Sequence, residues 1–312
     1  MGKVAFVFPG QGSQSVGMGK DFYELSEEVK TTFQTADQVL DFSLSTIIFE
    51  GPQEDLTLTY HAQPALLTTS IGMLREFGKH HIKPDFVAGH SLGEYSALVA
   101  ANVLSFEDAV MAVYKRGRYM DEAVPAGQGT MAAVLGMTAE ELKKVTDEIS
   151  AQGDEVQLAN INCPGQIVIS GTVTGVEKAS ALAKEKGAKR AIPLVVSGPF
   201  HSMLMKPAAK QLDDTLSTMT FRDADVPIVA NVTAQPVTNK DEIKEKLVEQ
   251  LYSPVRWQES VELLVEQGVD TFIEIGPGKV LSGLVKKVNR RATVHSVYDV
   301  ASLEATIQAL KG

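Results

Sequence analysis

Short apolar runs alternate with longer stretches of mixed apolar and polar residues along most of the chain. Four runs, at residues 3–8, 86–88, 227–231 and 271–275, are mainly apolar, as expected of strands buried on both faces of a parallel sheet. Between them, helical spacing of apolar residues predicts helices over residues 21–49, 65–77, 105–122, 203–218, 243–252 and 258–266. A strand at 293–297 and a terminal helix follow. This alternation predicts an α/β fold with a parallel sheet.

The pattern changes after the turn-forming stretch Pro125-Ala-Gly-Gln-Gly129. It then predicts, in order, a strand at 129–136, a helix at 138–150, strands at 156–162 and 166–170, a helix to about residue 186 and a strand at 189–196. Thr138 with Glu141, and Thr174 with Glu177, match the capping signature at the starts of the two helices. The order β-α-β-β-α-β is that of a ferredoxin-like unit. We therefore expect a ferredoxin-like small subdomain, 127–196, inserted into a larger subdomain formed by residues 1–126 and 197–312.

Residues 84–101 combine a short strand, a serine flanked by glycines and a helix. Phe86-Val87-Ala88 lead into Gly89-His-Ser-Leu-Gly93, and good helix formers follow. This is the G-x-S-x-G nucleophile elbow in its strand-turn-helix context, and it makes the large subdomain α/β-hydrolase-like. The two glycines leave room for a sharp turn that a Cβ would obstruct. The turn would expose the Ser91 hydroxyl at the carboxyl edge of the sheet, beside the positive end of the helix.

A serine nucleophile needs a base within hydrogen-bond reach, and histidine is the side chain tuned for this near neutral pH. Among the six histidines, His90 neighbours Ser91 but projects differently on an elbow, and His295 lies in a predicted strand. His201 follows a predicted strand, where an α/β sheet places working groups. No acid between Ser91 and His201 stands in the position of a third triad member. An amide or a backbone carbonyl could orient the base instead, which favours acyl transfer over a hydrolytic triad.

Composition and charge argue against several classes of function. The net charge of −10 argues against nucleic-acid binding, because phosphate contacts need a basic face. A single cysteine, Cys163, excludes an internal disulfide and a multi-thiolate metal site, and we expect no metal. No apolar run is long enough to cross a membrane, and the N-terminus lacks a signal-peptide pattern. We therefore expect a cytoplasmic protein.

Two further features do not by themselves decide the function. The loop at residues 9–14 is rich in glycine but lacks the dinucleotide fingerprint and a Walker lysine, so it is either a plain loop or a donor of backbone N–H groups to an oxyanion. The helix at 105–122 carries Lys115, Arg116 and Arg118, which by spacing alone indicate a solvated face. A serine hydrolase and an acyltransferase both fit these residues.

Eight stretches, collinear along the chain, resemble the malonyl-CoA:acyl carrier protein transacylases of bacterial type II fatty-acid synthesis. They are Phe8-Pro-Gly-Gln-Gly-Ser13, Gln63-Pro64, Gly89-His-Ser-Leu-Gly-Glu94, Arg116-Gly-Arg118, Asn160-Ile-Asn162, Gly198-Pro-Phe-His201, Gln250-Leu-Tyr-Ser-Pro-Val-Arg-Trp257 and Glu274-Ile-Gly-Pro-Gly278. They cover almost the whole chain, and together they are far more specific than a single match.

The resemblance implies the catalytic roles. Ser91 is expected to be the acylated nucleophile, His201 its base, and the backbone carbonyl of Gln250 the group that orients His201. The backbone N–H groups of Gln11 and Leu92 are expected to form the oxyanion hole, which would give the glycine-rich loop a function.

The same resemblance implies the substrate-binding residues. Arg116 is expected to pair with the malonyl carboxylate, a bidentate task for which lysine is a poor substitute. Gln63, Asn160 and Asn162 are expected to bind substrate with it. Phe200 matches relatives that select malonyl, since those that select methylmalonyl usually carry a smaller residue there.

The implied reaction is ping-pong transfer of malonyl from malonyl-CoA, a substrate, through Ser91 to the phosphopantetheine thiol of acyl carrier protein. We expect no cofactor, and we expect a monomer. Because such carriers are acidic, two basic clusters are candidates for docking: Lys286, Lys287, Arg290 and Arg291, or Lys184, Lys186, Lys189 and Arg190.

Three alternatives remain open. The chain could be an acyltransferase of a polyketide-type pathway, or a serine thioesterase or hydrolase that uses the same elbow. An inactive acyl-binding module is disfavoured by the presence of both Ser91 and His201.

Overall fold

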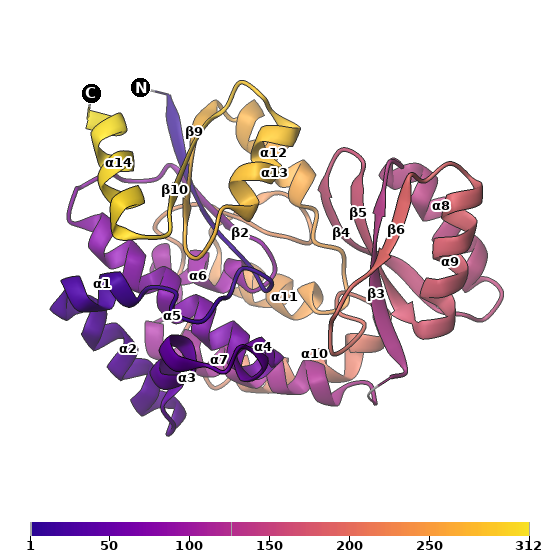
Figure 1. Ribbon diagram of the computed structural model, residues 1–312, viewed down its shortest axis with the longest axis horizontal. Coiled ribbons are helices and arrows are strands. Elements are labelled where there is room, and N and C mark those ends of the chain that lie inside the picture. Colours follow the sequence, from indigo (N-terminus) through magenta and orange to yellow (C-terminus); the bar gives the residue numbers. More distant parts are fainter. Residues whose placement is uncertain (1, 126, 312) are drawn as a thin grey trace.

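The computed structural model describes residues 2–125 and 127–311, which form two β-sheets beside each other, each with its own helices (Figure 1). The larger sheet has the strand order β10-β9-β1-β2-β7-β8. Its parallel strands are β1 (Lys3–Phe8), β2 (Phe86–Gly89), β7 (Ile228–Val229), β9 (Val269–Ile275) and β10 (Thr293–Val297). The short edge strand β8 (Pro236–Val237) is antiparallel to β7.

Helices cover both faces of the larger sheet, which is why its strands are mainly apolar. The helices that pack with it are α1 (Lys20–Leu25), α2 (Glu27–Leu40), α3 (Leu44–Glu50), α4 (Gln53–Thr57), α5 (Thr59–Gly78), α6 (Gly93–Ala100), α7 (Phe106–Glu122), α10 (Lys206–Leu216), α11 (Lys240–Gln250), α12 (Trp257–Glu266), α13 (Val280–Val288) and α14 (Val300–Lys311). Within residues 2–125 and 127–311, none of the helices combines the length and apolar character needed to span a bilayer.

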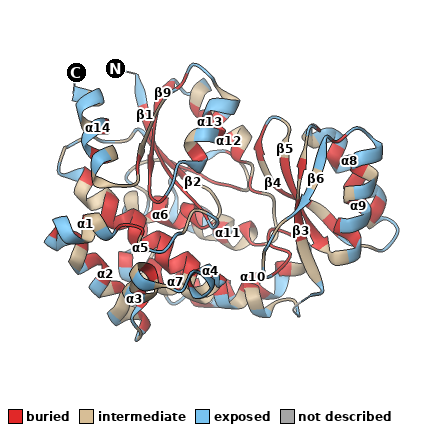
Figure 2. Cartoon of the chain, viewed as in Figure 1, coloured by how far each residue is buried: buried red, intermediate tan, exposed pale blue. Residues whose placement is uncertain are grey.

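Strand β1 lies between β9 and β2 in the larger sheet, and all of its residues except Lys3 are buried (Figure 2). Phe6 and Phe8 belong to a buried cluster with residues of α2, α5 and α7, whereas Ala5 and Val7 belong to a second cluster with residues of α12 and α13. Alternate residues of a strand point to opposite faces, so one apolar run serves both clusters. Each fully buried large apolar side chain contributes about 1.5–3 kcal/mol. The strand is therefore a rigid base for the loop that follows it.

The smaller sheet is antiparallel and has the strand order β4-β5-β3-β6. Its elements are β3 (Gly129–Leu135), α8 (Ala139–Ser150), β4 (Val156–Cys163), β5 (Gln166–Thr172), α9 (Val173–Glu185) and β6 (Arg190–Pro193). A separate apolar cluster joins the sheet to α8 and α9. The predicted β-α-β-β-α-β order is confirmed, and so is the fold class, a parallel α/β sheet with a ferredoxin-like unit.

The predicted subdomain boundaries, 1–126 with 197–312 and 127–196, stay a prediction. Residue 126, at the first of them, lies outside the described residues. The four strands of the smaller sheet and the helices α8 and α9 all fall between Gly129 and Pro193, inside the predicted small subdomain.

Several helix bounds differ from the prediction. The stretch 21–49 forms three helices, because Ser26 is extended and Asp41 adopts a left-handed backbone with φ 58°. Helix α5 begins at Thr59 rather than at residue 65, with Pro64 inside it. Its side chains are almost all buried from Ala62 to Met73, and this packing outweighs the hydrogen bond that proline cannot donate.

The capping predictions were partly wrong. The capping box of Thr138 and Glu141 is present, and Ser105 caps α7 by accepting from the Asp108 N–H. At α9, however, the capping side chain is Thr172, which accepts from Gly175 N–H at 3.0 Å, and not Thr174. The helix begins at Val173, directly after β5 ends, so the last residue of the strand, Thr172, is also the capping residue of the helix.

Candidate active site

The turn between β2 and α6 places Ser91 at the carboxyl end of β2. A Cβ on Gly89 would lie 1.9 Å from the Gly93 backbone, and one on Gly93 would lie 2.0 Å from the Phe8 carbonyl oxygen. Both positions therefore require glycine, as the sequence predicted. Ser91 itself has φ 51°, a strained conformation that costs about 1–3 kcal/mol. Its backbone N–H donates to Asn231 Oδ1 at 2.7 Å, which holds the turn in place.

His201 lies against Ser91, although 110 residues separate them. Its Nε2 is 2.8 Å from Ser91 Oγ, and its Nδ1 is 2.8 Å from the backbone carbonyl oxygen of Gln250. Because that carbonyl can only accept, Nδ1 carries the proton and Nε2 is free to accept one from the serine. Burial, with the nearby charge of Arg116, lowers the pKa of His201 to about 3. The imidazole is therefore neutral, as a base must be.

Arg116 is buried, so the solvated face that spacing alone indicated is wrong for this residue. One guanidinium nitrogen donates to Gln63 Oε1 at 2.6 Å; the other donates to Gln250 Oε1 at 2.8 Å and to Ser91 Oγ at 3.1 Å. Within the described residues, no carboxylate lies within 4.0 Å of it. A signal was present in the sequence: Val113 and Met120, at helical spacing from Arg116, belong to the buried stripe of α7.

Two residues that sequence reasoning gave no role, Glu94 and Asn231, lie directly behind these groups. Glu94 Oε2 accepts from Gln250 Nε2 at 2.7 Å and from the backbone N–H of Asn231 at 3.2 Å. Asn231 also donates from Nδ2 to the Gly89 carbonyl oxygen at 2.7 Å. Burial raises the pKa of Glu94 to about 7. Glu94 ends the stretch Gly89–Glu94 that carries the family resemblance and lies at the start of the elbow helix, and Asn231 lies at the end of a predicted strand.

A cavity of about 290 Å³ opens in front of Ser91 and His201. Its walls come from both sheets, with Met131 from β3, Asn160 from β4, Gln11 from the loop after β1, and Phe200 beside the histidine. Further lining comes from Gly12, Gln14, His90, Met120, Leu194, Val195 and Val196. The site thus lies between the two units, and its lining includes both apolar and polar side chains.

The remaining predicted residues lie around this cavity at different depths. The backbone N–H groups of Gln11 and Leu92 donate to no acceptor in the part of the chain that the structure describes, so both are available to a ligand. Gln63 and Asn162 do not line the cavity. Gln63 supports Arg116, and Asn162 Oδ1 lies 2.8 Å from His90 Nε2. His90 is thus engaged away from Ser91.

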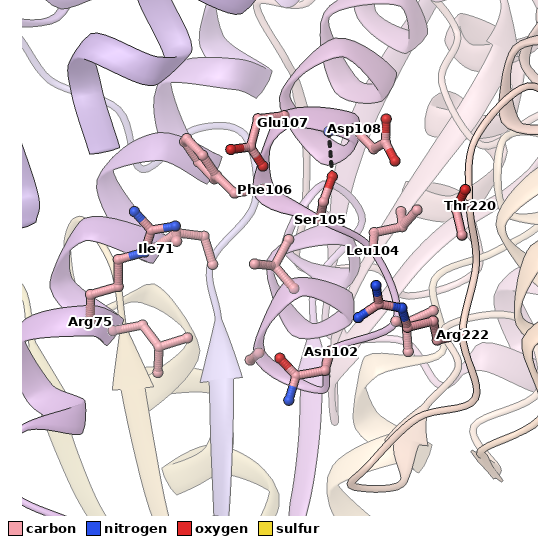
Figure 3. Close-up of a pocket in the computed structure, with 14 residues that line it drawn as sticks. Ile71, Arg75, Asn102, Leu104, Ser105, Phe106, Glu107, Asp108, Thr220 and Arg222 are labelled. Atoms are coloured by element: carbon pink, nitrogen blue, oxygen red, sulfur yellow. Dashed lines mark hydrogen bonds between the residues drawn. The ribbon is translucent and has the colours of Figure 1, made fainter. Parts of the chain in front are cut away.

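A second hollow, of about 430 Å³, lies at the other end of α7 (Figure 3). It also holds a serine and arginines, but Ser105 caps α7 and Arg75 donates to Thr32 Oγ1 at 2.6 Å. No histidine lines it. Across the described residues, histidine, cysteine and carboxylate side chains do not gather in a group that could hold a metal ion. The cavity at Ser91 is therefore the candidate active site.

The fold and this geometry define a class of α/β proteins that hold an elbow serine against a histidine, an arrangement suited to acyl transfer. The family model for the acyl transferase domain matches residues 5–306, so the chain belongs to that family.

Individual similar proteins indicate which kind of acyl transferase the chain resembles. The chain is 64% identical over 311 residues to the malonyl CoA-acyl carrier protein transacylase of Bacillus subtilis, which covers 100% of this chain and 98% of that protein. An acyl carrier protein S-malonyltransferase from Vibrio cholerae has a TM-score of 0.95 and 48% identity, over 97% of this chain and 99% of that one. A malonyl-transacylase in complex with a type II PKS acyl-carrier protein has a TM-score of 0.95 and 44% identity, over 98% and 99% of the two chains.

Proposed function

We propose that this chain transfers malonyl from malonyl-CoA to the phosphopantetheine thiol of acyl carrier protein, as a cytoplasmic, monomeric enzyme of fatty-acid biosynthesis. One observation carries the proposal: the buried Arg116 guanidinium lies 3.1 Å from Ser91 Oγ and has no carboxylate partner within 4.0 Å among the described residues. An acyl group on Ser91 that ends in a carboxylate would supply that partner. The names of the relatives agree with this substrate.

In the first half-reaction, Ser91 Oγ attacks the thioester carbonyl while His201 Nε2 takes the hydroxyl proton. The N–H groups of Gln11 and Leu92 stabilise the oxyanion. The intermediate then collapses, the C–S bond breaks, and His201 returns the proton to the departing CoA thiol. In the second half, His201 takes the proton of the carrier thiol, and the sulfur attacks the malonyl ester of Ser91. The bond between the acyl carbon and Ser91 Oγ then breaks, and His201 returns the proton to Ser91 Oγ, which frees the malonyl-carrier thioester and restores the enzyme. No step needs a metal or a cofactor.

Arg116 selects the acyl group in this scheme. Its side chain is held by Gln63 and Gln250, so little rotamer entropy remains to be lost when a carboxylate binds. Phe200 and Asn160 line the same cavity and limit the size of the acyl chain. Asn162 acts on it only through His90.

The carrier would dock on an exposed basic surface, since acyl carrier proteins are acidic. Lys286 and Lys287 lie in the last turn of α13, whereas Arg290 and Arg291 follow the helix rather than lying on it. All four are exposed. Lys286 and Lys287 donate to uncharged oxygens, of Ala292 and Gln166, whereas Lys186 of the other candidate cluster pairs with the carboxylate of Glu148 at 2.6 Å. The charge of the cluster at the end of α13 is therefore less neutralised, and we favour this cluster as the docking surface.

Charge reversal tests this docking surface. Lys286→Glu with Lys287→Glu should raise the KM for the carrier without changing the KM for malonyl-CoA, because only the carrier meets this surface. Initial-rate kinetics with each substrate varied in turn measures both values. An unchanged carrier KM would remove this cluster from consideration.

The proposed reaction is tested by the fate of the malonyl group. With malonyl-CoA and carrier present, malonyl-carrier should form faster than free malonate. Faster release of malonate would instead identify a serine hydrolase. A polyketide-type role is the second candidate, because one relative was solved with a type II PKS carrier. A higher kcat/KM for such a carrier than for a fatty-acid carrier would favour it.

A further inference from the structure

A single buried carboxylate connects the elbow, the histidine and the arginine. Glu94 is 2% exposed and lies three residues after Ser91, in the first turn of α6. Its two hydrogen-bond partners both hold functional atoms. The backbone carbonyl oxygen of Gln250 accepts from His201 Nδ1, and its side-chain Oε1 accepts from Arg116. Asn231 Oδ1 accepts from the Ser91 N–H.

The Gln250 side chain lies between two opposite charges. Its Nε2 faces the Glu94 carboxylate at 2.7 Å and its Oε1 faces the Arg116 guanidinium at 2.8 Å. An amide turned by 180° would place oxygen against carboxylate and NH₂ against guanidinium, so the two charges fix its orientation. They also avoid direct contact, which leaves part of the guanidinium available to a substrate carboxylate.

The charged and titratable groups around Glu94 are few. Arg116 faces it from α7, Tyr95 follows it on α6, and His201 reaches the same network through Gln250. On α5, which packs against α6, the charged side chains have other partners: His61 with Asp55, Arg75 with Thr32, and Glu76 with Lys79. Lys3 of β1 lies over the Phe86 ring. Arg116 is therefore the main counter-charge of Glu94.

We propose that Glu94 is a positioning residue, whose negative charge orients the Gln250 side chain and thereby aligns Arg116 with Ser91. The proposal rests on the proposed function, because malonyl transfer is its readout. Loss of the charge, by substitution or by protonation, would weaken the hold on the amide and loosen the arginine beside Ser91.

This role predicts an unusual pH dependence. Burial raises the pKa of Glu94 to about 7. The side chain is therefore negatively charged above that pH, and the charge is lost as the pH falls through it. His201, with its pKa lowered to about 3, stays neutral throughout this range. The kcat/KM for malonyl-CoA, which reports the free enzyme, should therefore fall below pH 7 because Glu94 becomes protonated.

The test is the pH profile of kcat/KM for Glu94→Gln, which keeps the shape and can still accept both hydrogen bonds. We expect the rate above pH 7 to drop about tenfold and the acidic limb near pH 7 to disappear. Glu274→Gln is the matched control: Glu274 is also buried, with its pKa raised by burial, but it accepts from Leu281 and Ser282 N–H groups at the start of α13. The control should keep the limb.

A second variant separates the effect of the charge at position 94 from the effect of the length of the side chain. Glu94→Asp retains the charge but shortens the side chain by one methylene, so it should keep an acidic limb and lose rate. This variant decides the question if Glu94→Gln fails to fold, as monitored by circular dichroism. An unchanged limb in Glu94→Gln, or a wild-type rate in Glu94→Asp, would overturn the proposal. Failure of the wild-type enzyme to transfer malonyl would overturn the proposed function instead.

Discussion

Two hollows lie at opposite ends of α7, and they use similar polar side chains in different ways. Each contains a serine and left-handed backbone: Asn102 has φ 59° in one, and Ser91 and His201 have φ 51° and 57° in the other. At the first end, Ser105 caps a helix and Arg222 is exposed to solvent. At the second, Ser91 lies within hydrogen-bond distance of both His201 and Arg116, and these two side chains are buried.

The difference shows that connection and burial, rather than residue type, define the site. A charge at the exposed end is screened by water, whereas Arg116 is 1% exposed and acts in a medium of much lower dielectric. Each functional group at the buried end is also held by a second residue: Asn231 holds Ser91, and Gln250 holds both His201 and Arg116. We expect substitutions at the two ends to have contrasting effects.

Removal of the histidine should have the largest effect. His201→Ala leaves Ser91 without a base, so kcat/KM for malonyl-CoA should fall about 10²–10⁴-fold. Stopped-flow measurement of CoA release gives this value. His80→Ala, in the turn after α5 and away from both hollows, is the control and should keep the wild-type rate. A loss of less than about tenfold in His201→Ala would mean that another group takes the proton.

Removal of the arginine at each end compares the two hollows directly. Arg116→Ala should reduce acylation by malonyl-CoA about a hundredfold and acylation by acetyl-CoA much less, because only malonyl offers a carboxylate. Arg222→Ala should change neither. A competition between the two thioesters, read as the ratio of the two adducts, measures this. If Arg116→Ala kept the malonyl preference, the ion pair would be wrong.

The elbow glycines should matter more for stability than glycines elsewhere. Gly89→Ala places a methyl group 1.9 Å from the Gly93 backbone, and we expect a loss of about 3 kcal/mol or more in the free energy of unfolding. Gly283→Ala, inside α13 with open space around the new methyl group, should instead gain about 1 kcal/mol. Urea denaturation measures both. Equal stability of the two variants would contradict the tight turn.

The smallest effect is expected at the exposed end. Ser105→Ala removes the side-chain acceptor for the Asp108 N–H and should cost about 1 kcal/mol of unfolding free energy. Malonyl transfer should be unchanged, because Ser105 touches none of the groups around Ser91. A clear loss of transfer at unchanged stability would show that the two ends of α7 are coupled.

Local sequence patterns predicted the fold well, because they record burial. The strand at 293–297 and the capping box at Thr138 were predicted from a few residues each and are confirmed. The breaks at Ser26 and Asp41 were missed, since a change of backbone angle leaves the apolar spacing on either side intact. Helix α5 was predicted to begin only after Pro64, because proline is typical of a helix boundary. The buried packing that keeps Pro64 inside the helix is not visible in the local sequence.

The site was less accessible to local reasoning. Spacing alone placed Arg116 on a solvated face, and its predicted role came from the family resemblance. Glu94 and Asn231 received no role because their partners lie far along the chain: 156 residues separate Glu94 from Gln250, and 140 separate Ser91 from Asn231. A linear sequence does not show which remote groups will share one buried network.

The central claim, that Ser91 carries malonyl between two thiols, is tested most directly by peptide mapping. The enzyme is mixed with malonyl-CoA, quenched in acid, digested and analysed by mass spectrometry, with and without a chase by acyl carrier protein. The account predicts a malonyl group on the peptide that contains Ser91, its loss during the chase, and its absence in Ser91→Ala. A malonyl group on another residue, or none on Ser91 while carrier is still malonylated, would contradict it.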